Sequence, residues 1–247
     1  MSIWLFDLGN SRLKCAPLRE DGGIGEVVHL PHDGNAFGAN WAAALPERFE
    51  AAYVSSVART ELRVALLDAL TQHCGLISLA RTQHRFGDVT IAYANPERFG
   101  VDRFLALLAA RARSKEPTLL AGIGTALTID LLDGDGRHRG GRIAPSPALM
   151  RASLHARAAH LPEQGGDYTE FADDTDDALA SGCDGAALAL VERSLRAAEE
   201  LLGQTPRLLV HGGGSEALFA HLPQATAAPS LVLEGLAVWV GETTGRR

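Results

Sequence analysis

The sequence predicts an α/β fold of two duplicated domains, each a mixed β-sheet flanked by helices, with a cleft between them. Two glycine turns carry this prediction. One strand pattern ends at Asp7–Ser11 (DLGNS), and another ends at Gly122–Ala126 (GIGTA), 115 residues later in a chain of 247. Strand and helix patterns follow each turn in a similar order. We therefore expect a duplication with domains 1–115 and 116–247, joined near residues 114–118.

The first half begins with a predicted β-hairpin. Apolar residues 3–6 favour one strand, and residues 12–18 favour a second strand that returns along it. Residues 51–57 (AAYVSSV) are again typical of a strand. Helices are expected at 60–73 and 97–113, because apolar side chains recur there every three or four positions.

The second half repeats the succession of strand, glycine turn and returning strand. Residues 127–132 follow the second turn, and Gly134–Gly136 reverses the chain. Apolar periodicity then predicts mainly helices. The further expected elements are strands at 118–123, from 140 to 143 and at 207–211, and helices at 147–159, 178–202, 215–221 and 231–243.

Composition excludes several classes of protein. A formal net charge of −7 without any basic run argues against nucleic-acid binding, which needs Lys and Arg against phosphates. No apolar run is long enough to span a membrane, and the N-terminus lacks the pattern of a signal peptide. The three cysteines form no C-x-x-C pair, and His29-x-x-His32 lacks further metal ligands nearby. A cytoplasmic protein is therefore expected.

The first turn has the residue types of a phosphate-binding loop. Gly9 lets backbone N–H groups approach an anion closely, and Asn10 and Ser11 add side-chain donors. Lys14 brings a positive charge, and Asp7 can hold Mg²⁺, usually through water. From these residues alone, an ordinary hairpin is an equally good interpretation.

The second turn supplies two glycines and the hydroxyl of Thr125. Two such turns in one duplicated chain predict a cleft that closes on the phosphates of a nucleotide from both sides. A third glycine segment, His211–Ser215 (HGGGS), follows a strand and leaves room for a flat ring or a phosphate near a helix N-terminus. A permissive loop is the alternative for that segment.

A carboxylate beside a guanidinium stands in the segment Gly100–Arg103 (GVDR), at the start of a helix pattern. Asp102 could accept a proton from a substrate hydroxyl, and Arg103 could bind a substrate carboxylate through two parallel hydrogen bonds. The alternative is a surface ion pair at a helix start, which spacing alone favours.

These motifs together resemble the type III pantothenate kinases, members of the actin-like (ribonuclease H-like) phosphotransferase superfamily. The resemblance covers nearly the whole chain, in order. It rests on Asp7-x-Gly-Asn-Ser-x-x-Lys14, Tyr93 and Pro96, Gly100-x-Asp102-Arg103, Gly124-Thr125-Ala126-x-Thr128-x-Asp130, Gly140-Gly141-x-Ile143-x-Pro145, Thr175-x-x-Ala178-x-x-x-Gly182 and His211-Gly212-Gly213.

The resemblance implies ATP-dependent phosphorylation of the primary hydroxyl of pantothenate, the first step of coenzyme A biosynthesis, by an ATP–Mg²⁺ enzyme that forms a homodimer. It implies that Asp102 is the general base and that Arg103 binds the pantothenate carboxylate. The other implied pantothenate contacts are Tyr93, Gly100, Val101 and Thr175. The implied ATP-binding residues are Asp7, Leu8, Gly9, Asn10, Ser11, Arg12, Leu13, Lys14 and Thr125, with Asp7 positioning Mg²⁺.

The sequence departs from the family pattern at two places. The family usually has Asp at the first position of its second phosphate motif, where it helps to bind K⁺ or NH₄⁺, whereas this chain has Gly122. Either the cation requirement is lost or another group replaces the carboxylate; Asp130 is present but lies beyond the turn. Ser146-Pro147 stands where Pro-Gly is typical, and proline fixes φ where glycine was free.

Two alternative functions fit the same motifs. One is a kinase of the superfamily that acts on a sugar or another hydroxy acid. The other is a catalytically silent relative that acts as a regulatory or accessory binding protein; Asp7, Lys14, Asp102 and Arg103 argue against it, and Gly122 leaves it open.

Overall fold

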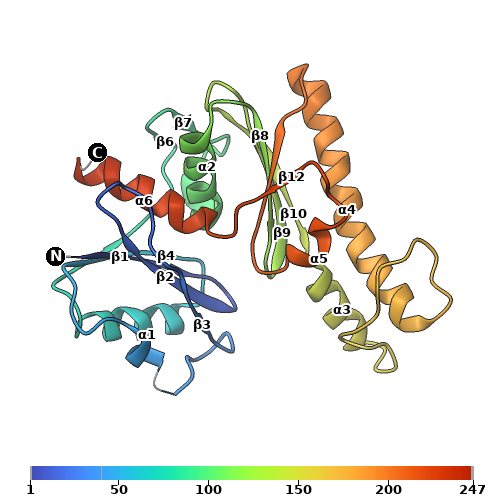
Figure 1. The fold of residues 1–247 in the computed structure, drawn as a ribbon, viewed down its shortest axis with the longest axis horizontal. Coiled ribbons are helices and arrows are strands. Elements are labelled where there is room, and N and C mark those ends of the chain that lie inside the picture. The colour runs from blue at the N-terminus through green and yellow to red at the C-terminus, as the bar shows by residue number, and fades with distance from the viewer. Residues whose placement is uncertain (1, 40, 246–247) are drawn as a thin grey trace. The chain divides into compact units, whose positions relative to one another are not determined.

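The computed structural model describes residues 2–39 and 41–245. By their internal contacts these residues form two compact units, one of the described residues up to 114 together with 230–245, and the other Lys115–Pro229. The sequence assigns residues 116–247 to one domain, but the last helix, α6 (Leu231–Thr244), groups with the first unit. The reason is packing, because α6 makes its main contacts with α2 (Val101–Arg113), beside which it lies in Figure 1.

The first unit is built on a five-stranded mixed sheet in the order β3-β2-β1-β4-β5. The central strand β1 pairs antiparallel with β2 and parallel with β4. Helix α1 connects β4 to β5. The bounds are β1 Ile3–Leu8, β2 Arg12–Leu18, β3 Val28–Pro31, β4 Ala51–Ser56, α1 Thr60–Leu70, β5 Leu76–Leu79, β6 Arg85–Phe86 and β7 Val89–Thr90, with 3₁₀ turns at Trp41–Ala44 and Pro96–Arg98.

The second unit has the same strand order and directions, β10-β9-β8-β11-β12, with β8 antiparallel to β9 and parallel to β11. The predicted α/β duplication with mixed sheets is therefore confirmed. The bounds are β8 Thr118–Ile123, β9 Ala126–Leu132, β10 His138–Pro145, α3 Pro147–His155, α4 Thr175–Leu202, β11 Arg207–His211, α5 Glu216–Phe219 and β12 Ala225–Ala227.

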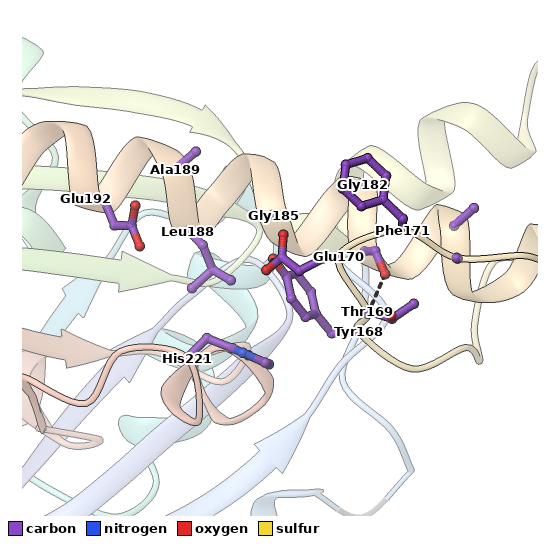
Figure 2. Close-up of a pocket in the computed structure, with 13 residues that line it drawn as sticks. Tyr168, Thr169, Glu170, Phe171, Gly182, Gly185, Leu188, Ala189, Glu192 and His221 are labelled. Atoms are coloured by element: carbon purple, nitrogen blue, oxygen red, sulfur yellow. Dashed lines mark hydrogen bonds between the residues drawn. The ribbon is translucent and has the colours of Figure 1, made fainter.

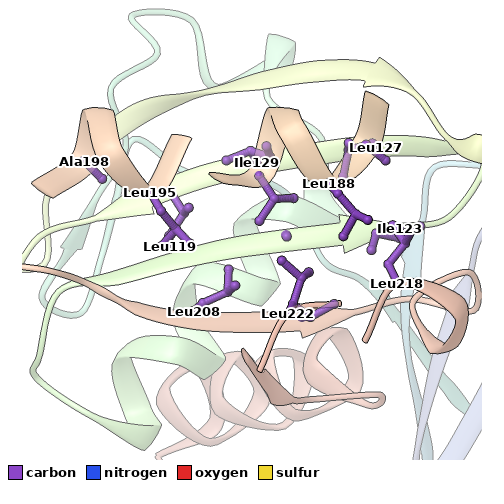
Figure 3. Packing of buried hydrophobic residues seen from close by; sticks show 14 of the residues in the cluster. Leu119, Ile123, Leu127, Ile129, Leu188, Leu195, Ala198, Leu208, Leu218 and Leu222 are labelled. Carbon is purple, nitrogen blue, oxygen red and sulfur yellow. The ribbon is translucent and has the colours of Figure 1, made fainter. Parts of the chain in front are cut away.

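Each sheet is covered by apolar helix faces. In the first unit, Leu62 and Leu66 of α1 pack in one cluster with Phe6 and Val54 of the central strands. In the second unit, α4 supplies Leu188, Val191 and Leu195 to a cluster with Leu119, Ile123 and Ile129 of the sheet (Figure 3). Burying one such side chain contributes about 1.5–3 kcal/mol. The central strands are therefore fixed, and the turns at their ends have rigid supports.

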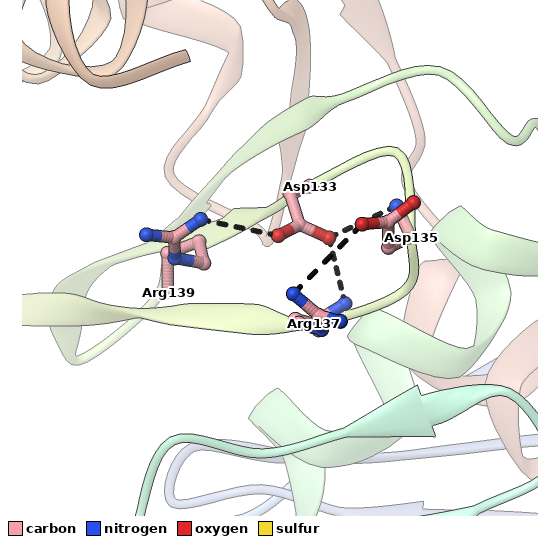
Figure 4. Close-up of polar contacts among 4 residues, drawn as sticks. All are labelled: Asp133, Asp135, Arg137 and Arg139. Carbon is pink, nitrogen blue, oxygen red and sulfur yellow. Dashed lines mark hydrogen bonds and ion pairs between the residues drawn. The ribbon is translucent and has the colours of Figure 1, made fainter.

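The predicted reversal at Gly134–Gly136 is the β9–β10 turn (Figure 4). The buried carboxylate of Asp133 accepts the backbone N–H groups of Asp135 and Arg137, at 3.0 and 2.9 Å. Its second oxygen accepts from the Arg139 guanidinium at 3.3 Å. Gly136 has φ +80°, which side chains rarely tolerate. One aspartate thus closes the turn.

Some element boundaries differ from the prediction. The helix expected at 97–113 begins only at Val101. Asn95 caps a separate 3₁₀ turn by accepting the Glu97 N–H, and Phe99 is extended, so the chain straightens before α2 begins. The edge strands β3, β5 and β12 were not predicted, because three or four residues are too short to show a period.

Candidate active site

The first glycine turn joins β1 to β2. Its backbone closes through the Gly9 N–H, which donates to the Arg12 carbonyl at 3.1 Å, while Asn10 and Ser11 are exposed. His32 supports the turn from β3's end. Its Nδ1 accepts from the Gly34 N–H, so Nε2 carries the proton and donates to the Gly9 carbonyl at 3.1 Å. His32, predicted not to bind metal, therefore holds the turn in shape.

Asp7 lies at the end of β1 among charged and polar neighbours. The register places Lys14 opposite it on β2 and Ser55 opposite it on β4. Burial, and then the nearby Asp102 carboxylate, raise the pKa of Asp7 from 3.8 to about 7, partly offset by Lys14 and by the Ser55 hydroxyl. Burial likewise lowers the pKa of Lys14. Such a carboxylate favours a bound cation.

Asp102 lies in the first turn of α2, where the helix dipole favours negative charge. One of its carboxylate oxygens accepts the N–H of Arg103 at 2.8 Å. A Cβ added at Gly100 would lie 2.6 Å from that same oxygen. A side chain at residue 100 would therefore force the Asp102 carboxylate to move from this position.

Arg103 is 7% exposed and lies among aromatic rings. Its guanidinium carbon is 4.6 Å from the centroid of Phe99 and 5.9 Å from that of Tyr93, and the two rings are 4.9 Å apart. Cation–π contact fixes the guanidinium while its edge can still donate hydrogen bonds. Asp7, Tyr93, Asp102 and Arg103 thus belong to one unit, as does Lys14. Sequence reasoning missed Phe99, whose only signal was its position before the GVDR segment.

The second glycine turn joins β8 to β9. The Gly124 N–H donates to the Ala126 carbonyl at 2.9 Å, and Thr125 is exposed. The Ser146 hydroxyl donates to the Thr125 carbonyl at 3.0 Å and caps α3 by accepting the Leu149 N–H at 3.3 Å. Pro147 is the first residue of that helix, a position where its fixed φ suits the helix. Ser146-Pro147 therefore forms a cap that also holds the second turn.

The triple-glycine segment lies against the end of β8. Gly212 has φ +97°, and a Cβ there would lie within 2.3 Å of the Ile123 carbonyl oxygen. The Gly214 N–H donates to that oxygen at 2.9 Å. The helix that follows, α5, has only four residues. Close backbone packing accounts for Gly212 without any bound ligand.

Gly122 stands where Asp7 stands in the first unit, at the end of the central strand. Its register partners are Thr128 on β9 and His211 on β11. A Cβ at Gly122 would lie 2.7 Å from Thr128 Oγ1 and 2.8 Å from His211 Nε2. Asp130, the acid considered as a substitute, is buried and paired with His138 at 2.9 Å. Residue 122 thus offers no side-chain oxygen, and the usual site for K⁺ or NH₄⁺ does not fit these residues.

Thr175 is the first residue of α4, in the second unit. Asp174 caps this helix by accepting the Asp177 N–H at 2.9 Å, and Asp176 and Asp177 lie in its first turn. The acidic residues at the start of the helix therefore stabilise its N-terminus.

A cavity of about 780 Å³ lies beside α4 in the second unit (Figure 2). It is lined by Tyr168, Glu170, Glu192 and His221 among others, and the Tyr168 and His221 rings are 4.4 Å apart. None of the predicted site residues lines it.

The model of the type III pantothenate kinase family matches residues 3–197. The chain belongs to the type III pantothenate kinase family. It is 56% identical over 239 residues to the type III pantothenate kinase of Stenotrophomonas maltophilia strain K279a, covering 97% of both chains. This family membership makes it an ATP-dependent kinase that phosphorylates pantothenate, the first step of coenzyme A biosynthesis.

Solved structures agree on the fold. The chain superposes on a conserved putative Baf family transcriptional activator from Campylobacter jejuni with a TM-score of 0.67 and 19% identity, covering 98% of this chain and 99% of that one. An archaeal actin homolog matches with a TM-score of 0.52 and 10% identity over the full length of both chains. At these identities the likeness establishes the actin-like fold alone.

The described residues hold no cluster of three metal-ligating side chains. Mg²⁺ needs less, since it is usually bound by one or two carboxylates together with substrate phosphates and water. Asp7, with its pKa raised by burial and by Asp102, fits that requirement. Among the same residues, no helix is long and apolar enough to cross a membrane.

Proposed function

We propose that Asp102 is the general base of this pantothenate kinase and that Arg103, Tyr93, Gly100, Val101 and Thr175 bind pantothenate. The proximity of Asp7 and Asp102 carries this assignment, because the Asp102 carboxylate raises the pKa of Asp7. The two acids thus lie close enough for one to hold Mg²⁺ and the other to accept a proton. The Asp102 carboxylate accepts the substrate hydroxyl proton as the hydroxyl oxygen attacks the γ-phosphorus, and the bond from that phosphorus to the β,γ-bridging oxygen breaks to release ADP.

Substrate orientation falls to Arg103. Its guanidinium is held against Phe99 and near Tyr93, so its direction is set before substrate arrives. A planar guanidinium can then bind the pantothenate carboxylate with two parallel hydrogen bonds. This contact at one end of pantothenate positions the hydroxyl at the other end, which is how positioning lowers the barrier of phosphoryl transfer.

ATP phosphates are assigned to Asp7, Leu8, Gly9, Asn10, Ser11, Arg12, Leu13 and Lys14 of the first turn and to Thr125 of the second. Backbone N–H groups of a tight turn and the Lys14 ammonium neutralise phosphate charge. Asp7 would hold Mg²⁺, through water, and the bound ion would neutralise charge on the ATP phosphates.

The assignment of Asp102 is tested with Asp102→Asn in a coupled assay for phosphopantothenate, with MgATP and pantothenate. We expect kcat to fall at least about 100-fold, since a general base contributes about 10²–10⁴, with the KM for ATP little changed. Asp88→Asn is the matched control, because Asp88 pairs with Arg111 in the last turn of α2, whereas Asp102 lies in the first turn. An unchanged kcat in Asp102→Asn would remove Asp102 as the base.

The same assay decides between the kinase and its alternatives. Turnover of a sugar or another hydroxy acid in preference to pantothenate would favour a different kinase. Binding of pantothenate or ATP without any turnover would favour a silent accessory protein.

We also propose a cytoplasmic homodimer formed through the second unit. Large apolar side chains are exposed there on β10 and α3, namely Ile143 (66%), Leu149 (40%) and Leu154 (43%). An apolar cavity of about 520 Å³ between α3 and α4 adjoins Leu154. Large apolar side chains exposed on neighbouring elements are typical of an interface. The three cysteines, all free, suit a reducing compartment.

Light scattering on a sizing column tests the dimer. Leu154→Glu should convert the dimer to a monomer at micromolar concentration, because a buried unpaired charge is costly. Leu201→Glu changes a still more exposed leucine (56%), near the C-terminal end of α4, and should leave the dimer intact. A Leu154→Glu protein that stays dimeric would contradict this surface.

A further inference from the structure

The two units permit a residue-by-residue comparison of their glycine turns. Asp7 ends β1 with Lys14 opposite on the antiparallel neighbour and Ser55 opposite on the parallel neighbour. Gly122 occupies the same place on β8, with Thr128 opposite on β9 and His211 opposite on β11. The duplication thus sets Gly122 against Asp7 and His211 against Ser55.

The imidazole of His211 fills the space that a side chain at residue 122 would need. A Cβ at Gly122 would meet His211 Nε2 at 2.8 Å, His211 Cε1 at 2.9 Å and Thr128 Oγ1 at 2.7 Å. Contacts below 3.0 Å require the neighbours to move. A carboxylate at 122 and the present position of the His211 ring therefore exclude each other.

The chemistry of the site changes with this exchange. Alkali-metal and ammonium ions in proteins are held by oxygen atoms, which a carboxylate at 122 would supply. An imidazole instead presents an N–H donor in either tautomer and competes for the same volume as the ion. The glycine segment after His211 is anchored on the Ile123 carbonyl, so the ring is carried by a fixed backbone.

We propose that His211, lying over the bare backbone of Gly122, replaces the carboxylate-bound monovalent cation at the second turn, so that this kinase works without K⁺ or NH₄⁺. The proposal rests on the proposed phosphate-binding role of the second turn. His211 is a positioning residue here. Its N–H group takes over the stabilisation of the second turn that the ion would otherwise give.

The first experiment compares cations at constant ionic strength. Phosphopantothenate formation by the parent protein is measured in KCl, NH₄Cl, NaCl and choline chloride, with MgATP saturating. We expect rates that agree within about twofold, because Gly122 supplies no carboxylate to hold a selective ion. A loss of tenfold or more in choline chloride, restored by K⁺, would overturn the proposal.

A binding readout separates this proposal from the assignment of activity. The melting temperature of the MgATP complex is measured in the same four salts, whether or not turnover is seen. A protein with a K⁺ site gains RT ln(1 + [K⁺]/Kd) of stability, whereas we expect no K⁺-specific increase. If turnover is absent and melting is independent of K⁺, the proposed function fails, whereas the inference that the second turn binds no K⁺ stands. A K⁺-specific increase overturns the proposal even if the enzyme is active.

Variants test the exchange itself. His211→Ala should lower kcat/KM about tenfold or more, as removal of one charge-stabilising donor does. The matched control is His221→Ala in the same unit. Gly122→Asp with His211→Ala restores the carboxylate and frees its space, and this double variant should gain activity and melting temperature with K⁺ but not with choline. The role of His211 would be contradicted if K⁺ changed neither the activity nor the melting temperature of the double variant and if His211→Ala kept the parent kcat/KM.

Discussion

The two glycine turns stand at the same place in the same sheet topology, yet they carry opposite chemistry. At the first, Asp7 lies between Lys14 and Ser55, and its pKa is raised to about 7. Its charged form is therefore disfavoured in the free protein and would be stabilised by a bound cation. At the second, Gly122 has no side chain, and Thr128 and His211 fill the gap. A duplicated fold can therefore specialise each copy by exchanging residues at equivalent register positions while both sheets stay unchanged.

The largest effect is expected from removing the charge of the first turn, which would make it more like the second. Asp7→Asn should lower kcat at least about 100-fold, as loss of a main electrostatic group does. It should also raise the MgCl₂ concentration that gives half of the maximal rate. Steady-state kinetics over a MgCl₂ titration measures both. Full activity with unchanged Mg²⁺ dependence would contradict the assignment of Asp7.

The same variant should be more stable than the parent in the absence of ligands. The pKa of Asp7 is raised from 3.8 to about 7 on folding, so charging this carboxylate costs folding free energy. The cost is absent below pH 4, grows as the pH rises to 7 and then levels off. Asn carries no such cost, and its advantage should reach roughly 1–3 kcal/mol at pH 8. Urea unfolding at pH 5 and pH 8 checks the sign.

The second unit should respond most strongly where its backbone approaches most closely. Gly212→Ala should destabilise the protein by about 3 kcal/mol or more, since it combines a strained φ of +97° with a clash against the Ile123 carbonyl. Gly38→Ala is the control, because no atom lies within 4 Å of a Cβ there. Similar unfolding midpoints for both variants would show that the backbone around Gly212 shifts to accommodate the alanine side chain.

Arg103→Lys tests the substrate end of the first unit. The lysine keeps the charge but loses the planar fork and much of its contact with Phe99. We expect the KM for pantothenate to rise about tenfold, the cost of a lost charged hydrogen bond, with the KM for ATP within twofold. A rise in the KM for ATP, with the KM for pantothenate unchanged, would show that Arg103 binds the nucleotide instead.

The smallest effects should come from the side chains that hold each turn. His32 donates to the Gly9 carbonyl in the first unit, and Ser146 donates to the Thr125 carbonyl in the second. Each alanine substitution should cost about 1 kcal/mol, with Ser146→Ala the costlier because it also removes the cap of α3. Calorimetric melting of both variants gives the comparison.

The sequence alone predicted the parts of the molecule that depend on local pattern. Glycine turns and apolar periodicity were enough for the duplicated α/β fold, and the motifs along the whole chain carried the resemblance to the family. Most central strands were placed within one residue, for example β11 at Arg207–His211. These turns, strands and helices depend mainly on residues that are close in the sequence, so a local pattern is enough to predict them.

Tertiary structure decided what depends on residues far apart in the chain. Helix α6 joined the first unit because its apolar face fits α2, and short edge strands formed only because a neighbouring strand was there to pair with. Phe99 beside Arg103 and Ser146 on Thr125 emerged in the same way. The sequence showed that an acid is missing at Gly122, but only the pairing of β8 with β11 brings His211 into its place. Strand pairing brings such residues together, and it cannot be predicted from the amino acids that neighbour each residue in the sequence.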